Sequence, residues 1–491
     1  MPFLSVFMMN ILLVNPPNCG RSIPEERYGI TSLKQIFRGE PLALEELAGN
    51  LLEQRVRILD LKAAPAIPGS SGIRPSLAVA APASRSCAVL GARDTGPSLA
   101  CVPGARGIRP SMAVADLDGL DAELREFQPD VVGITGVTCE ANTMLQIAAR
   151  VKESCQAIVV VGGIHASNDP AFFNHEAVDY IVVGIGKKVF ADLVSVVENG
   201  HDIVDLPGVI RARPGSLIER PPLRNCVDDL VMERPPAYGL VSRYRSHYIL
   251  EKMGINMGFV ASAYGCPHRC LFCSIYGQTG GGYLTKSIDT VIRDIGLLPD
   301  IPIIRLVDAN TFGDIKRAEE LGRALLASGL KKQYLADIRS DTVVRHPEML
   351  RQWKEAGLRA VIIGFEEIDD ASLSAMNKAN QASMNAEAIT ILNDLGITIV
   401  GDFIISPDYD EDDFDRLDTY LGTRQIDLPM VTVMTPLPGT ALYRQEHHRI
   451  INHNLDYYTL TNAVTPTRLD EQRFYSRYAA LLATSHQNAR L

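Results

Sequence analysis

Short runs of apolar residues alternate with helical patterns through residues 1–200. Short apolar runs separated by helices are typical of strands that are buried on both faces of a parallel sheet. The pattern predicts strands at 10–15, 56–61, 131–137, 157–163 and 179–184, with helices at 40–54, 117–127 and 141–153 and from Val189. This half is therefore predicted to be an α/β doubly wound (Rossmann-like) domain, which binds ligands at the carboxyl ends of its strands.

The second half of the chain repeats a strand–helix unit with few interruptions. Strands are predicted at 258–263, 303–308, 333–338, 360–364, 397–405 and 431–435. Helices are predicted between them, at 286–298, 315–328, 346–357, 383–395 and 411–423. Six such units predict a parallel partial (β/α) barrel, whose site lies at the C-terminal ends of the strands.

These patterns divide the chain into four parts. Residues 201–255 are rich in proline and are interpreted as a linker, and residues 441–491 carry apolar residues at helical spacing and are interpreted as a helical tail. The predicted division is a doubly wound domain at 1–200, the linker at 201–255, the partial barrel at 256–440 and the tail at 441–491.

One stretch of the first domain breaks its pattern. The nonapeptide GIRPSLAVA at 72–80 recurs as GIRPSMAVA at 107–115, and the residues between are rich in Ala, Gly, Pro and Ser. Such low-complexity composition does not favour a packed core. Residues 64–115 are therefore predicted to be a disordered, repeat-containing insertion, tolerated as a surface loop because the cost of loop closure grows slowly with length.

Composition and charge narrow the class of protein. A net charge of −10 over 491 residues argues against a broad nucleic-acid surface. No apolar run reaches the roughly 18 residues of a membrane span. The start, MPFLSVFMMNILLVNPP, lacks the basic region and small-residue cleavage site of a signal peptide. We expect a cytoplasmic protein with a short leader before its first strand.

Three of the nine cysteines cluster as C-x3-C-x2-C in the segment YGCPHRCLFC, at Cys266, Cys270 and Cys273. Such a loop can ligate three irons of a cubane and leave the fourth iron open to a substrate. A structural zinc site is the alternative, but it uses four closed ligands, and His268 lies inside the loop. The other six cysteines lack metal-like spacing and are interpreted as small buried residues: Cys19, Cys87, Cys101, Cys139, Cys155 and Cys226.

This loop, after the first strand of a six-stranded barrel and with Phe272 before the third cysteine, resembles the radical S-adenosylmethionine (SAM) superfamily. The resemblance implies a [4Fe–4S] cluster whose open iron is chelated by SAM. It implies that the reduced cluster cleaves SAM to methionine and a 5′-deoxyadenosyl radical, which abstracts hydrogen from an unactivated carbon. An external one-electron reductant, flavodoxin-like or ferredoxin-like, is the implied partner.

Other segments resemble the same superfamily. The segment IIRLVDANTF offers Asp308 and Asn310 near the SAM methionyl group, and AVIIGFEE places Glu366 at a strand end where the family often contacts SAM. The segment TPLPGT, at 435–440, resembles the turn after the sixth strand. For each acidic residue the alternative is a helix cap or a solvated side chain.

The segments NILLVNPP, VVGITGV, VVVGGIHAS and DYIVVGIG resemble the cobalamin-binding domain of the B12-dependent radical SAM subfamily. The motif D-x-H-x-x-G, which supplies a cobalt ligand in other B12 proteins, is missing, and Gly186-Lys187-Lys188 stands where relatives often carry an acidic residue. The resemblance implies cobalamin contacts at Asn15, Thr135, Gly163, His165 and Gly184.

The resemblance implies methyl transfer from SAM to an unactivated carbon of a small-molecule substrate, with one SAM supplying the methyl group by way of cobalamin and a second the radical. A cobalamin-dependent cyclase or rearrangement enzyme without methyl transfer is the alternative. A methylthiotransferase would need three further N-terminal cysteines for a second cluster. A non-enzymatic carrier would not need an open iron. The sequence leaves the substrate and any catalytic side chain unassigned.

Overall fold

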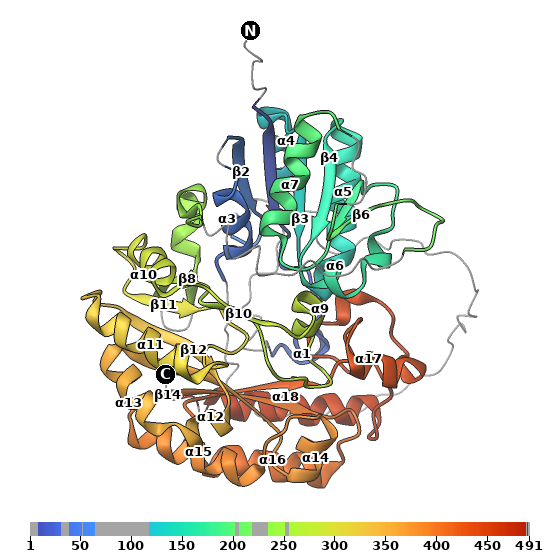
Figure 1. Ribbon diagram of the computed structural model, residues 1–491. Coiled ribbons are helices and arrows are strands. Elements are labelled where there is room, and N and C mark those ends of the chain that lie inside the picture. Colours follow the sequence, from blue (N-terminus) through green and yellow to red (C-terminus); the bar gives the residue numbers. More distant parts are fainter. Residues whose placement is uncertain are drawn as a thin grey trace, which may run out of the picture.

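The computed structural model describes residues 8–30, 39–51, 53–63, 117–201, 206–218, 234–250, 255–487 and 489. The predicted insertion at 64–115 lies outside the described residues, as do Cys87, Cys101 and Cys226. Figure 1 shows the N-terminal sheet above the barrel, with the C-terminal helices beneath and beside the barrel.

The N-terminal sheet has the strand order β2-β1-β3-β4-β5-β6, and all neighbours are parallel except β5 and β6. The strands are β1 (Asn10–Asn15), β2 (Arg55–Asp60), β3 (Val131–Thr135), β4 (Ile158–Gly162), β5 (Tyr180–Val182) and β6 (Val209–Arg211). The chain reverses its direction of progress across the sheet at β1. Ligands in such sheets bind in the crevice beside this reversal.

Alternate side chains of these strands face opposite helix layers. Ile11 and Leu13 pack with α3 (Leu42–Gly49) and α7 (Gly186–Glu198). Leu12 and Val14 pack with α4 (Asp118–Phe127) and α5 (Ala141–Ser154). Both faces are buried, as the continuous apolar runs of the sequence predict.

The second sheet has the order β15-β14-β13-β12-β11-β8-β7, with six parallel strands and β7 antiparallel at one edge. Its strands are β7 (Ile249–Leu250), β8 (Ile255–Val260), β11 (Ile303–Leu306), β12 (Gln333–Ile338), β13 (Leu358–Glu366), β14 (Thr398–Ile405) and β15 (Leu428–Val433). It is the predicted partial barrel.

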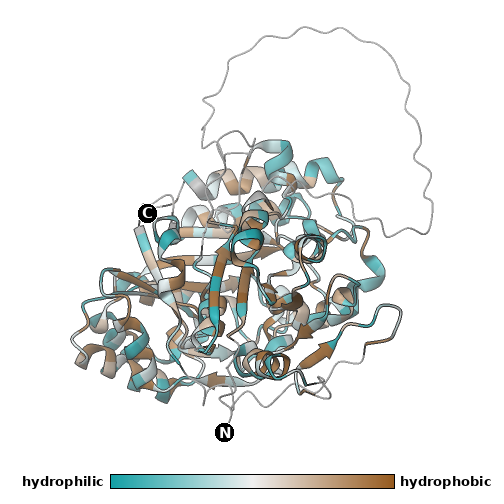
Figure 2. Ribbon diagram, turned by 90° about the horizontal axis from the view of Figure 1, so that it is seen from above, coloured by the Kyte–Doolittle hydropathy of each residue, from teal (hydrophilic) through white to brown (hydrophobic). Residues whose placement is uncertain are grey.

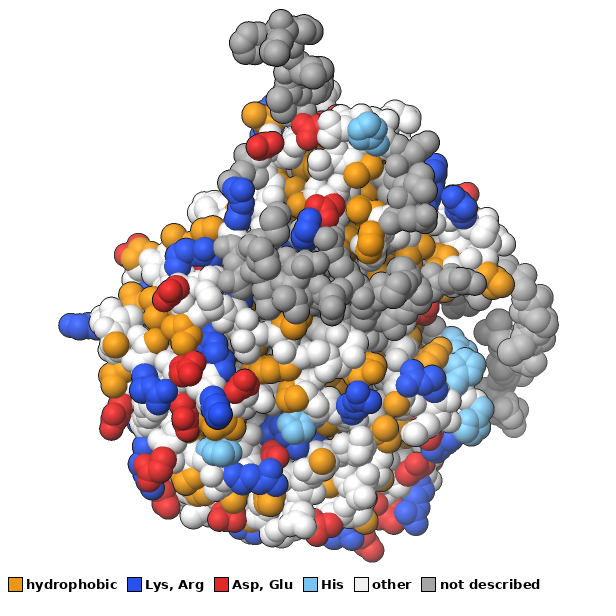
Figure 3. Space-filling view, in the orientation of Figure 1, with side chains coloured by type: hydrophobic (Ala, Val, Ile, Leu, Met, Phe, Trp, Pro, Cys, Tyr) orange, Lys and Arg blue, Asp and Glu red, His pale blue; other side chains and the backbone are white. Residues whose placement is uncertain are grey.

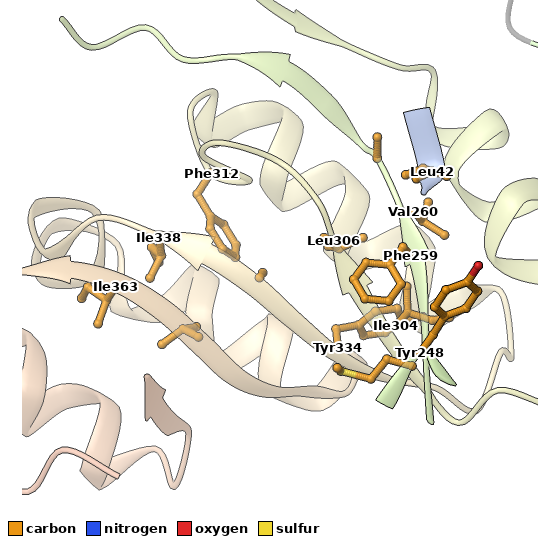
Figure 4. Packing of buried hydrophobic residues seen from close by; sticks show 14 of the residues in the cluster. Leu42, Tyr248, Phe259, Val260, Ile304, Leu306, Phe312, Tyr334, Ile338 and Ile363 are labelled. Carbon is orange, nitrogen blue, oxygen red and sulfur yellow. The ribbon is translucent and has the colours of Figure 1, made fainter. Parts of the chain in front are cut away.

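Helices cover the outer face of the barrel: α10 (Ile288–Gly296), α11 (Ile315–Ala327), α13 (Pro347–Ala356), α15 (Ala382–Asp394) and α16 (Glu411–Thr423). Trp353 of α13 is fully buried against α11, and its indole Nε1 donates to the Ala318 carbonyl at 2.9 Å. Figure 2 shows apolar residues gathered on the interior strands and hydrophilic residues on the outer helix turns. In Figure 4, Leu42 of α3 lies close to Val260 of β8, so one apolar core extends across both domains.

The segments between and after the two domains contain more structure than the sequence pattern predicted. The predicted linker supplies β6, β7 and the 3-10 segment Tyr238–His247. The C-terminal region supplies α17 (Ala441–Glu446) and α18 (Glu471–Gln487), and its Leu455 and Tyr458 pack against the N-terminal sheet. Strands of two or three residues are too short to show a period, which explains why they were missed.

On the face shown in Figure 3, Lys and Arg side chains are interspersed with Asp and Glu over the barrel. Opposite charges at this spacing screen one another, so this face presents no broad field of one sign. Among the described residues, no helix combines the length and the apolar character needed to cross a bilayer.

Candidate active site

The cysteine loop lies between the two domains. It runs from β9 (Ala263–Gly265), which pairs antiparallel with β10 (Tyr283–Thr285), to α9 (Ile275–Thr279). Gly265 has a φ of +78°, and a Cβ there would lie 2.0 Å from the Gly282 carbonyl oxygen. Only glycine fits a left-handed turn with so close a neighbour, so the chain can turn directly into Cys266.

Backbone hydrogen bonds hold the loop on both sides. The Leu271 N–H donates to the Met376 carbonyl at 3.1 Å, and the Leu271 carbonyl accepts from the Leu442 N–H at 2.9 Å. The Asn377 Nδ2 donates to the Arg269 carbonyl at 2.8 Å. The loop is therefore fixed between the segment that follows β13 and helix α17.

Cys266, Cys270 and Cys273 are half-buried free thiols. Burial raises the pKa of the Cys273 thiol to about 11. Across the described residues, no three His, Cys, Asp or Glu side chains converge on one metal ion. A cubane takes each thiolate on a different iron, so its ligands need not converge. This donor set fits a [4Fe–4S] cluster better than a closed zinc site, which needs four convergent ligands.

Two buried cations that sequence reasoning missed lie near the cysteines. Burial raises the pKa of Cys270, and the positive charges of Lys378 and Arg339 oppose that rise. The Arg339 guanidinium contacts the Asp341 carboxylate at 2.9 Å and donates to the Lys378 carbonyl at 2.8 Å. Arg339 follows the predicted strand at 333–338, a position that could have indicated it, whereas no local pattern marks Lys378. Cations here suit an anionic cluster and the carboxylate of a bound amino acid.

Hydrogen bonds to Asp308 stabilise the turn that leads to the cysteine loop. Its carboxylate accepts from the Ser262 N–H at 2.7 Å, the Ser262 hydroxyl at 2.7 Å and the Ala263 N–H at 2.9 Å. These bonds tie the end of β11 to the start of β9. The geometry supports a positioning role for Asp308, and the predicted contact with SAM remains a prediction.

Asn310 is buried at 2% exposure, and its Nδ2 has no hydrogen-bond partner among the described residues. Its Oδ1 accepts from the Phe312 N–H at 3.3 Å, which orients the amide. Leaving a buried donor unpaired costs about 1–3 kcal/mol. A ligand that accepts from this nitrogen would remove that cost, so Asn310 stays a candidate SAM contact.

Glu366, at the end of β13, has the left-handed φ of +64°, which is uncommon for a residue with a side chain. Its carboxylate pairs with the Lys378 ammonium at 2.6 Å, and both side chains are buried. Gly364 leaves room for this pair, because a Cβ there would lie 2.3 Å from the Glu366 Oε1. Strain of this kind is commonly kept at functional sites, which agrees with Glu366 as a SAM contact.

A cavity of about 120 Å³ opens at the carboxyl ends of β3, β4 and β5. Thr135, Gly163 and Gly184 line it, as predicted for a cobalamin site. Gly163 has a φ of +94°, and a Cβ there would lie 2.5 Å from the Thr135 Oγ1. Most of its lining residues are apolar side chains or glycines, which suits an aromatic group such as the nucleotide base of cobalamin.

Two of the residues predicted to contact cobalamin, Asn15 and His165, are not in the lining of this cavity. The Asn15 Nδ2 donates to the Asp60 carboxylate at 2.7 Å, away from the residues that line the cavity. His165 is also outside the lining and is fully buried, with ring centroids 5.2 Å from Phe172 and 5.6 Å from Phe173. Burial lowers the pKa of His165 to about 4. Neither ring nitrogen of His165 has a hydrogen-bond partner among the described residues, so the predicted cobalamin contact at His165 stays a prediction.

A second cavity, of about 390 Å³, is lined by Leu271 and Phe272 of the cysteine loop and by the segments that follow β13, β14 and β15. Glu367 lines it, is 2% exposed, and accepts from the Tyr409 hydroxyl at 2.6 Å. Burial raises the pKa of Glu367 from its ordinary 4.5 to about 7.

Glu367→Gln should change the pH dependence of stability. A carboxyl whose pKa is raised by folding holds its proton more tightly in the folded state, so its contribution to stability falls as the pH rises from about 4.5 through about 7. The free energy of unfolding of the wild type should fall by about 3 kcal/mol relative to the variant over that window. Urea unfolding at several pH values measures it, with the exposed Glu387→Gln as control. Parallel pH profiles for wild type and Glu367→Gln would contradict the assignment.

Comparison with known protein families identifies the family to which this two-domain chain belongs. Residues 260–421 match the radical SAM superfamily, and residues 108–194 match the B12 binding domain. The chain belongs to the cobalamin-dependent radical SAM enzyme family. Its cofactors are a [4Fe–4S] cluster, SAM and cobalamin.

Relatives within this family carry out different reactions. The chain is 27% identical over 361 residues to the hopanoid C-3 methylase of Methylococcus capsulatus. The aligned region covers 72% of this chain and 68% of the methylase. It is 27% identical over 364 residues to the anaerobic magnesium-protoporphyrin IX monomethyl ester cyclase of Cereibacter sphaeroides. This aligned region covers 71% of this chain and 57% of the cyclase.

A solved structure shares the fold. The cobalamin-dependent SAM radical enzyme OxsB, with aqua-cobalamin and SAM bound, superposes with a TM-score of 0.66 and 14% identity over 94% of this chain and 65% of that chain. At this identity the likeness extends to the fold and not to the substrate.

Proposed function

We propose that the enzyme transfers a methyl group from SAM to an unactivated carbon of a small-molecule substrate. The observation that carries the proposal is the contact between the cobalamin cavity and the cluster loop. Gly162 and Gly163 line the cavity and lead into the short helix α6 (Ile164–Asn168). Asn168, at the end of that helix, donates to the carbonyl of Ser274, the residue after Cys273, at 3.0 Å. Methyl transfer needs both cofactors to serve one substrate, and this contact brings their sites together.

Different residues are proposed to bind the cluster, SAM and cobalamin. Cys266, Cys270 and Cys273 hold the cluster, and Asn310, Arg339 and Glu366 lie where they could bind and orient SAM. Thr135, Gly163 and Gly184 receive cobalamin at the strand ends. When bound, SAM supplies a 5′-deoxyadenosyl radical and cobalamin carries the methyl group. A flavodoxin-like or ferredoxin-like protein is the proposed electron donor.

The proposed domains are a cobalamin-binding domain at 1–200, a connecting segment at 201–255, a radical SAM barrel at 256–440 and a C-terminal region at 441–491. The match of the B12 binding domain to residues 108–194 and of the radical SAM superfamily to residues 260–421 supports the two main parts.

Cyclisation or rearrangement without methyl transfer is the second candidate. The similarity to the magnesium-protoporphyrin cyclase, over 71% of this chain, favours it. Both reactions begin with a substrate radical, so the cofactor sites alone do not separate them. An isotope label on the methyl group of SAM separates the two reactions.

Labelled SAM should separate the two reactions. The anaerobic, reduced holoenzyme is incubated with SAM carrying a CD3 group and with hopanoids, tetrapyrroles and fractionated small molecules. We expect a product heavier by one CD3 group, with 5′-deoxyadenosine and S-adenosylhomocysteine both formed. Mass spectrometry measures all three compounds. A changed substrate that contains no deuterium would establish the cyclase or rearrangement reaction instead.

A further inference from the structure

Two residues of the barrel domain help to close the cobalamin cavity. Tyr264 precedes Cys266 by two residues, and Gln278 follows Cys273 by five residues. Both line the cavity, whereas the other described lining residues come from α3, β3, β4, β5 and α7 of the N-terminal domain and from the turns beside them. The segment that carries the three cysteines is therefore flanked on each side by a cavity-lining residue.

A buried charged network fixes Tyr264. Its hydroxyl donates to the Glu46 carboxylate at 2.6 Å and accepts from the Lys187 ammonium, which lies 4.5 Å from the ring centroid. Glu46 also accepts from Lys286 at 2.8 Å. Glu46 and Lys187 belong to the cobalamin domain, and Tyr264 and Lys286 belong to the barrel. Charge-assisted bonds in a buried setting hold such partners rigidly.

Gln278 is held by its helix. A Cβ at Gly277 would lie 1.9 Å from the Asn168 Oδ1 and 2.5 Å from the Asn168 Cγ, so glycine at 277 permits the close approach of α9 to α6. Asn168 also bonds to the Ser274 carbonyl, at the start of the same helix. Helix α6, which directly follows the cavity-lining Gly163, therefore packs against the segment that follows the third cysteine.

We propose that Tyr264 and Gln278 contact bound cobalamin, so that cobalamin binding and cluster binding stabilise each other. The proposal rests on cobalamin occupying the cavity, as in the proposed function. A ligand that contacts Tyr264 and Gln278 further stabilises the folded arrangement of these two residues, and with it the arrangement of the cysteine loop between them. The loop then loses less conformational freedom when the cluster assembles. Linkage requires the assembled cluster to tighten cobalamin by the same factor.

The full-length chain tests this before and after cluster reconstitution. Hydroxocobalamin is titrated anaerobically into each form, and the dissociation constants are compared. We expect cobalamin to bind about 5- to 20-fold more tightly when the cluster is present. The reciprocal measurement is iron release to a chelator, which cobalamin should slow.

Two variants locate the coupling. Tyr264→Phe keeps the ring and removes the hydroxyl, and Gln278→Ala lies outside the charged network, so it tests the proposal even if the first variant folds poorly. Both should retain iron, lose cobalamin affinity mainly in the cluster-loaded form, and bring the ratio of dissociation constants close to 1. The control is Tyr478→Phe, which removes a buried hydroxyl bonded to the Val431 carbonyl at 2.9 Å in the remote α18.

The outcomes separate this inference from the proposed function. Equal cobalamin affinities with and without the cluster overturn the coupling but leave methyl transfer standing, because cobalamin still binds. Full coupling in both variants overturns the roles of Tyr264 and Gln278. Failure of either form to bind cobalamin overturns the coupling together with the cobalamin-dependent function.

Discussion

A variant with alanine at Cys266, Cys270 and Cys273 should bind no iron and form no 5′-deoxyadenosine from SAM. The three thiolates are the ligands that the loop offers to three different irons, and among the described residues no three His, Cys, Asp or Glu side chains converge on a single metal ion. Without the cluster, no electron reaches SAM, so the loss of cleavage should be complete. Iron should fall from about four atoms per chain to none.

Iron and cobalt analysis after anaerobic reconstitution measures the first effect, and chromatography of the SAM reaction measures the second. Cys155→Ala is the matched control, since it removes a half-buried free thiol at the end of α5 in the N-terminal domain. It should keep its iron and cleave SAM. A triple variant that still produced 5′-deoxyadenosine would show that the cluster is held elsewhere. About eight irons without cobalt in the wild type would favour a methylthiotransferase.

Replacing Gly163 with alanine should weaken cobalamin binding at least tenfold while leaving the iron content unchanged. The φ of +94° costs an alanine about 1–2 kcal/mol, and the new methyl group would lie 2.5 Å from the Thr135 Oγ1 and 3.0 Å from the Gly136 backbone. The backbone of Gly136 cannot move aside as easily as the end of a flexible side chain, so the segment after β4 must shift at the mouth of the cavity. A shift that costs about 1.4 kcal/mol of binding free energy is tenfold in affinity.

The chain offers a control for the backbone strain alone. Gly215 has a φ of +85°, but a Cβ there would meet nothing within 4 Å. Gly215→Ala should therefore carry the same conformational cost without the clash and bind cobalamin as the wild type does. Titration with hydroxocobalamin, followed by its absorbance, compares the three proteins. Unchanged affinity in Gly163→Ala would exclude this cavity as the cobalamin site.

The strands and helices of both domains were largely predictable because the residues that they bury recur in the sequence at the spacing of a strand or a helix. The predicted strands at 10–15 and 333–338 and the predicted helix at 411–423 coincide with β1, β12 and α16. β6 and β7 were missed, since strands this short pair with a neighbour without needing a pattern of their own.

The candidate site was predictable where the chemistry depends on sequence spacing. The three cysteines fall on one loop between β9 and α9, and Thr135, Gly163 and Gly184 line the cavity at their strand ends. Asn15 ends β1 and bonds to Asp60, and His165 lies in the short helix after β4, where its ring packs against Phe172 and Phe173. Position along a strand was readable from the sequence, whereas side-chain direction depends on neighbours that come from distant segments.

The sequence by itself determined the two α/β architectures, the spacing of the three cysteines and the strand ends that line the cavity, because local periodicity and spacing encode all three. Only the tertiary structure decided how the two sites meet. Tyr264, Lys187 and Glu46 come from three elements separated by more than 70 residues each, and Asn168 meets Ser274 across 106 positions. Contacts of this kind arise when both domains pack, and no local pattern in the chain records them.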